Sequence, residues 1–102
     1  MAEYRIRAVA FRRGDWWIAQ CLDYNLVTQT RRLEEIPYAL ERQLAVQIHA
    51  SLARGIEPFS DFSPAPRRYW EMYERARARL EPIAGQPVTV DPLLTTETRL
   101  AA

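Results

Sequence analysis

The spacing of hydrophobic positions changes along the chain, and these changes divide it into elements. Residues 3–12 alternate with a period of two, which is the pattern of a β-strand. A Gly-containing turn leads to a second alternating run at 16–22, and a third short strand is predicted at 26–30. Because the connections between these runs are so short, we expect the three strands to form an antiparallel meander.

The next segment, residues 33–54, has the spacing of an amphipathic helix. Its apolar stripe consists of Ile36, Leu40, Leu44, Ile48 and Leu52. Arg54 and Gly55 are typical of a helix end. Pro37 would remove a hydrogen bond deeper in the helix, so the regular helix is expected to begin near Glu35 or Ile36.

The second half of the chain has weaker patterns. A connector rich in proline is predicted at 56–65, followed by a second helix at 66–80 that begins with Pro66. Residues 86–91 can form a short edge strand bounded by prolines, and residues 93–102 are predicted to be a flexible tail.

These elements predict the α+β fold class. The chain of 102 residues is long enough for one domain. We assign it to residues 1–92, with a core at 3–55 in which the antiparallel meander packs on the long helix. The second helix and the fourth strand would complete this domain.

The second predicted strand has large apolar side chains on both faces. One face is expected to pack on the long helix. The other face carries Trp16, Ile18 and Leu22, which would form an exposed apolar patch unless something covers it. We therefore predict an interaction surface and a homodimer or higher oligomer, with Arg5 and Arg7 of the first strand as further contacts. The second helix is the alternative cover, and it would allow a monomer.

The net charge of the chain does not identify a class of binding partner. All fourteen basic residues are arginine, and with thirteen acidic residues the formal net charge is only +1. A protein this close to neutral lacks the overall charge of a binder of the phosphate backbone.

The second helix is the exception, because it combines arginines with aromatic side chains. Its candidate nucleic-acid contacts are Arg67, Arg68, Arg75 and Arg79. Arginine and aromatic groups together can bind single strands by charge and stacking. The alternative is that the arginines pair with glutamates of the same helix while the aromatic residues belong to the core.

Candidate catalytic groups are few. Cys21 lies two residues before Asp23, but a nucleophilic cysteine usually needs a histidine, and the only histidine is His49 in the long helix. A structural thiol is the simpler interpretation. No spacing suits a metal or a phosphate loop, so we expect no enzyme activity and no cofactor. No apolar run is long enough for a membrane span and no signal peptide is evident, so a cytoplasmic protein is expected.

The order of elements and three short sequences resemble the HicB-like antitoxin family. The strand ending in Cys21-Leu22-Asp23, the segment Val27-Thr28-Gln29-Thr30 and the helix start Leu33-Glu34-Glu35-Ile36 correspond to the family's pattern over residues 3–52. The chain departs from that pattern at Tyr24-Asn25, Thr30 and Arg32. It also has no recognisable ribbon-helix-helix or helix-turn-helix segment, so operator binding is not implied.

The resemblance implies a domain that acts by protein–protein contact and has no catalytic residues. Such domains are similar to neutralisers of a small HicA-type toxin that cleaves mRNA, and they commonly self-associate. An orphan relative with another protein partner fits equally well. The alternative is a small module that binds RNA or single strands through the helix at 67–79.

Overall fold

The computed structural model describes residues 4–80 and 94–101. The elements in chain order are β1 (Tyr4–Arg13), β2 (Trp16–Cys21), β3 (Val27–Thr30), the 3-10 turn η1 (Leu33–Glu35), α1 (Ile36–Ala53), α2 (Arg67–Arg75), β4 (Ala78–Arg79) and β5 (Leu94–Leu100). The strands form one five-stranded sheet in the order β3-β2-β1-β5-β4. The predicted α+β class is thus confirmed at the level of a five-stranded sheet with two helices.

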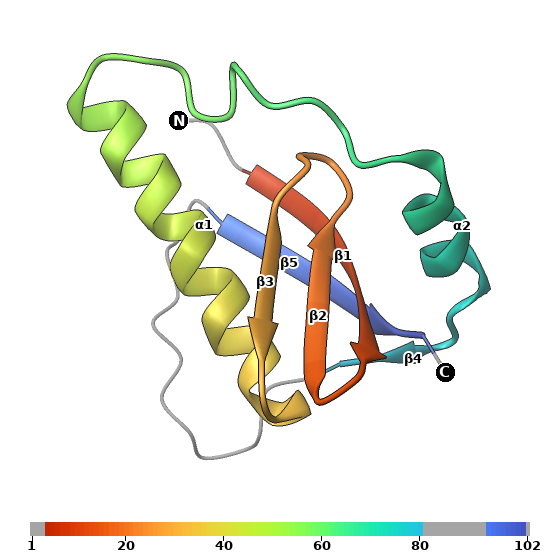
Figure 1. Ribbon diagram of the computed structural model, residues 1–102. Helices are drawn as coiled ribbons and strands as arrows, with labels where there is room; N and C mark the ends of the chain where they lie inside the picture. The colour runs from red at the N-terminus through yellow and green to blue at the C-terminus, as the bar shows by residue number, and fades with distance from the viewer. Residues whose placement is uncertain (1–3, 81–93, 102) are drawn as a thin grey trace.

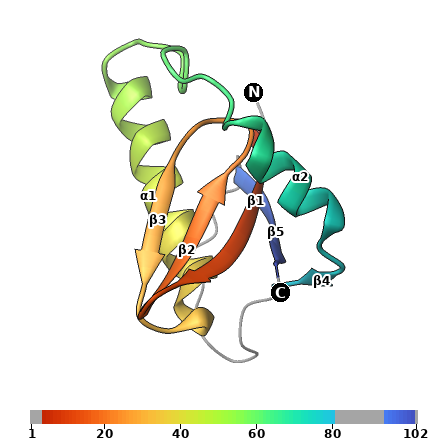
Figure 2. The ribbon, with the colours of Figure 1, turned by 45° about the vertical axis from the view of Figure 1, so that its right-hand side comes forward.

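The sheet is the middle layer of the molecule, with α1 on one side and α2 on the other (Figures 1 and 2). β1, β2 and β3 pair antiparallel, with Ala8 opposite Cys21 and Trp17 opposite Thr30. β5 lies on the other side of β1 and runs parallel to it, with Tyr4 opposite Leu94. Because side chains alternate along a strand, the sheet presents residues to the helix on each of its two faces.

The first layer of buried side chains lies between the sheet and α1. Its buried core includes Ile6, Ala8 and Cys21 from the strands and Leu40, Leu44 and Ile48 from the helix. The regular α-helix begins at Ile36, with Pro37 in its first turn, as expected from the position of this proline. Leu52, expected in the same stripe, is 49% exposed because the buried part of the stripe ends at Ile48.

The second layer of buried side chains lies between the opposite face of the sheet and α2. Val9, Leu22, Ala65, Tyr69 and Tyr73 form its buried cluster. α2 ends at Arg75, so the predicted helix at 66–80 was too long. Ala76 is extended, and the next residues pair with the end of β5 as the short strand β4. Tertiary pairing here overrides the helical propensity of an Ala/Arg segment.

The predicted flexible tail at 93–102 was wrong. Residues 94–100 form β5, whose pairing with β1 extends from Leu94 to Leu100. Leu94 and Thr98 are buried, at 3% and 5% exposure. The edge strand predicted at 86–91 lies outside the described residues. Among the residues that are described, no helix has the length and apolar character needed to cross a membrane.

Candidate functional site

The predicted apolar patch on the second face of the sheet is covered rather than exposed. Leu22 is fully buried beneath α2, in the same cluster as Tyr69, and Ile18 is also buried. Trp16 is partly exposed, and the guanidinium of Arg31 lies 4.0 Å from the centre of its ring. The prediction that Ile18 and Leu22 form an exposed apolar patch was therefore wrong, since both are buried and α2 covers Leu22.

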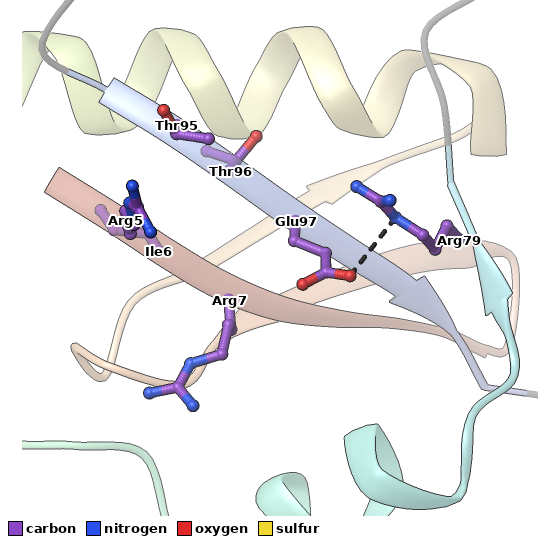
Figure 3. Close-up of a pocket in the computed structure, with 7 residues that line it drawn as sticks. All are labelled: Arg5, Ile6, Arg7, Arg79, Thr95, Thr96 and Glu97. Atoms are coloured by element: carbon purple, nitrogen blue, oxygen red, sulfur yellow. Dashed lines mark ion pairs between the residues drawn. The ribbon is translucent and has the colours of Figure 1, made fainter.

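The predicted arginines of this face do come together, in a groove beside α2. It has a volume of about 550 Å³ and is open to solvent. We call it the arginine groove, and it is lined by Arg5, Ile6, Arg7, Arg79, Thr95, Thr96 and Glu97 (Figure 3). The lining residues come from β1, β4 and β5, so the groove depends on the parallel pairing of β1 with β5.

Glu97 of β5 is fixed in position within the groove. One of its carboxylate oxygens lies 3.3 Å from Nε of Arg79, and the other accepts a 2.9 Å hydrogen bond from the Tyr73 hydroxyl of α2. Burial, reinforced by the hydrogen bond to Glu97, raises the pKa of Tyr73. The hydroxyl therefore stays protonated as a donor and connects α2 to the floor of the groove.

Arg7 is held at the opposite side of the groove by Asp23. Its guanidinium lies 2.6 Å from the Asp23 carboxylate, which also accepts the backbone N–H of Arg7 at 2.7 Å. The guanidinium is also 4.6 Å from the centre of the Trp70 ring. The side-chain hydrogen bond with Asp23 is the largest cause of a raised pKa for Arg7. Arg7 is thus a permanent cation whose position is fixed by Asp23 and by the Trp70 ring of α2.

Arg5 differs from the other two arginines of the groove. Its side chain is exposed, and it forms no hydrogen bond or ion pair with the residues that the structure describes. A guanidinium presents several N–H donors in a planar fork that suits a carboxylate or phosphate. Arg5 is therefore the group of the groove best able to accept an anionic partner without first breaking an internal contact.

The arginines predicted as nucleic-acid contacts belong to two different elements. Arg67, Arg68 and Arg75 belong to α2, whereas Arg79 lies on β4 in the arginine groove. The side chain of Arg67 is 92% exposed and lies 3.5 Å from the carboxylate of Glu71.

The aromatic residues beside those arginines belong to the core. Tyr69 and Tyr73 are only 9% and 6% exposed, so their rings are not available for stacking on bases. Arg68 contacts Tyr69, and its guanidinium donates a 3.0 Å hydrogen bond to the tyrosine hydroxyl. Trp70 is the aromatic residue of α2 that stays partly exposed, and the guanidinium of Arg7 lies over its ring.

Cys21 is fully buried in the layer between the sheet and α1. Burial raises the pKa of its thiol to about 12, and the nearby charge of Asp23 acts in the same direction. His49 is exposed on α1, next to the buried Ile48. This geometry gives Cys21 the properties of a core side chain rather than those of a thiolate nucleophile.

Sequence reasoning missed the part of the groove that β5 provides. Thr95, Thr96 and Glu97 lie in the segment predicted to be a tail, and no local signal places that segment beside Arg5. Within the described residues, no group of three or more His, Cys, Asp or Glu side chains has the arrangement of a metal site. Comparison with protein-family models, curated proteins and solved structures finds no match to this chain.

Proposed function

We propose that this chain is a non-enzymatic, HicB-like protein–protein interaction domain whose contact surface includes the arginine groove. The observation that carries the proposal is that Arg79 of β4 lines the same groove as Arg5 and Arg7 of β1. Two of these cations are fixed by internal contacts and Arg5 is left exposed. A surface prepared in this way can bind a partner with little loss of side-chain freedom.

Within this proposal, the partner is a small RNA-cleaving toxin of the HicA type, or another protein if the chain is an orphan relative. The resemblance of residues 3–52 to HicB-like antitoxins supports the first version. The fixed geometry of the groove supports a protein partner in both versions. We also propose a cytoplasmic location, in keeping with a partner that cleaves mRNA.

Self-association remains part of the proposal, but on a surface other than the apolar face from which it was predicted. The apolar face that required a second subunit is covered by α2. Within the described residues, the exposed large apolar side chains are instead Val27 on β3 and Val46, Leu52 and Ile56 in and after α1. A homodimer held by apolar contacts would use one or more of these side chains.

Affinity purification of the tagged chain from its own cells tests the proposed function. A toxin partner should be recovered in stoichiometric amount, cleave RNA in a purified assay and lose that activity when the chain is added. Recovery of the chain alone, or of a partner whose activity the chain leaves unchanged, would contradict the antitoxin version. The charge-reversal variant Arg5→Glu should recover less partner, and Arg42→Glu, which changes an exposed arginine of α1, serves as the matched control.

Binding of RNA or single strands remains the alternative function. The exposure of Arg67 on α2 favours it, since a charged helix face can contact phosphates without stacking. It predicts a strong decrease in oligonucleotide affinity with added salt and with the variant Arg67→Glu. Affinity that is independent of salt would contradict this alternative.

A further inference from the structure

We infer that the arginine groove binds an extended acidic segment of a partner protein, with a carboxylate on Arg5 and the peptide backbone along the outer edge of β5. This inference rests on the proposed function and names the chemistry of its partner. The surface around the groove offers two kinds of contact, one from charged side chains and one from the backbone of a sheet edge.

The edge of β5 provides the backbone contact. Within the described residues, β4 pairs with β5 only at Arg99 and Leu100, and the N–H of Leu80 donates to the carbonyl of Thr98 at 2.8 Å. Backbone groups two residues apart along a strand face the same side, so those of Thr96 are directed toward the same outer edge. Beside Thr96, the described residues include no further strand. An extended segment can pair with such an edge by main-chain hydrogen bonds.

The charges beside this edge favour a carboxylate over a polyphosphate. Arg5 is exposed and Arg79 flanks the same groove, so an acidic side chain has cations within the groove (Figure 3). Glu97 lies between them and is paired with Arg79, so Arg5 is the cation best placed for an added carboxylate. Tyr73, which contacts Glu97, is buried, and the guanidinium of Arg7 lies over the Trp70 ring. One exposed cation beside a strand edge suits a single carboxylate of an extended peptide better than a run of phosphates, which needs several cations.

A titration followed by nuclear magnetic resonance tests the inference. The probe is a short peptide of alternating threonine and glutamate, added to the full ¹⁵N-labelled chain. Alternation places all glutamates on one face of an extended strand, where they can meet Arg5. We expect saturable shifts at the amides of Arg5, Thr95, Thr96 and Glu97. We also expect about tenfold weaker binding when glutamine replaces glutamate, because a charged hydrogen bond is lost.

Two charge-reversal variants identify the site. Arg5→Glu should weaken binding of the glutamate peptide at least about tenfold, and Arg42→Glu, on α1 away from the groove, should leave it unchanged. Because the Arg5 side chain forms no hydrogen bond or ion pair within the described residues, the Arg5→Glu protein should fold normally, which its amide spectrum checks directly.

Three outcomes would overturn the inference: absence of shifts in the groove, equal affinity for the glutamine peptide, or unchanged binding by Arg5→Glu. Stronger groove shifts with single-stranded oligouridine than with the peptide would also overturn it, in favour of phosphate recognition. The proposed function is tested separately, by recovery and inhibition of a toxin. If Arg5→Glu still recovers and inhibits a toxin, the chain is an antitoxin whose partner docks elsewhere.

Discussion

Truncation of Leu44 tests the buried layer between α1 and the sheet. Leu44 is fully buried, in the cluster that α1 forms with β1, β2 and β5. Replacing a buried leucine by alanine removes its transfer free energy and leaves a cavity, at a cost of about 2–5 kcal/mol. A domain of this length is typically stable by roughly 5–15 kcal/mol, so Leu44→Ala should remove a large fraction of the folding free energy.

Leu52→Ala is the matched control, since it makes the same substitution in the same helix. Leu52 is 49% exposed, so its truncation should cost only about 1 kcal/mol. Urea denaturation followed by tryptophan fluorescence measures both variants, and Trp17 beside the sheet core reports on unfolding. The midpoint of Leu44→Ala should fall well below that of Leu52→Ala at a similar m-value. Equal midpoints would refute the assignment of Leu44 to the buried part of the stripe and of Leu52 to its exposed end.

Four further predictions concern polar and titratable groups. Cys21 should react slowly with iodoacetamide at pH 8 in the native chain and rapidly in urea; fast native alkylation would contradict its burial. Because its pKa is raised in the folded state from 9.0 to about 12, its contribution to stability is full below about pH 9 and is lost as the pH rises toward 12. Thermal melts should therefore show a weaker alkaline decline for Cys21→Ala than for the parent chain. Tyr73→Phe removes the donor to Glu97 and should cost about 1 kcal/mol in urea denaturation. Asp23→Ala leaves the backbone N–H of Arg7 without its acceptor and should cost about 1–3 kcal/mol, whereas a neutral effect would mean that water replaces the carboxylate.

The elements with regular hydrophobic patterns could be predicted from the sequence. The three strands of the meander are joined by short turns, and α1 has a sustained helical stripe, so local sequence determines most of their geometry. The end of α2 could not be predicted in the same way. Residues after Arg75 have good helical propensity, and only their pairing with Arg99 and Leu100 makes them a strand.

β5 was missed because its pattern is weak. The residues on its buried side include Leu94 and Thr98, so polar threonine occupies a position where a strand pattern normally has an apolar residue. Its partner, β1, is close in space and remote in sequence, and no local signal reports such pairing. The arginine groove was missed for the same reason. Arg5 and Arg7 were predicted as contact residues from the sequence, but Thr95 and Glu97 join them only through β5.

The parallel pairing of β1 with β5 also has a consequence for how the chain folds. Tyr4 pairs with Leu94, 90 positions later, whereas β1, β2 and β3 pair through short turns. Contacts of such high sequence separation form late, because closing a long loop costs entropy before the contact stabilises it. β1 therefore has an open edge in the partly folded chain, where it could pair with another molecule. Arg5 and Arg7 alternate along that edge, and charged side chains at a strand edge oppose aggregation. The same arginines that line the groove would thus oppose association through this edge until β5 pairs with it.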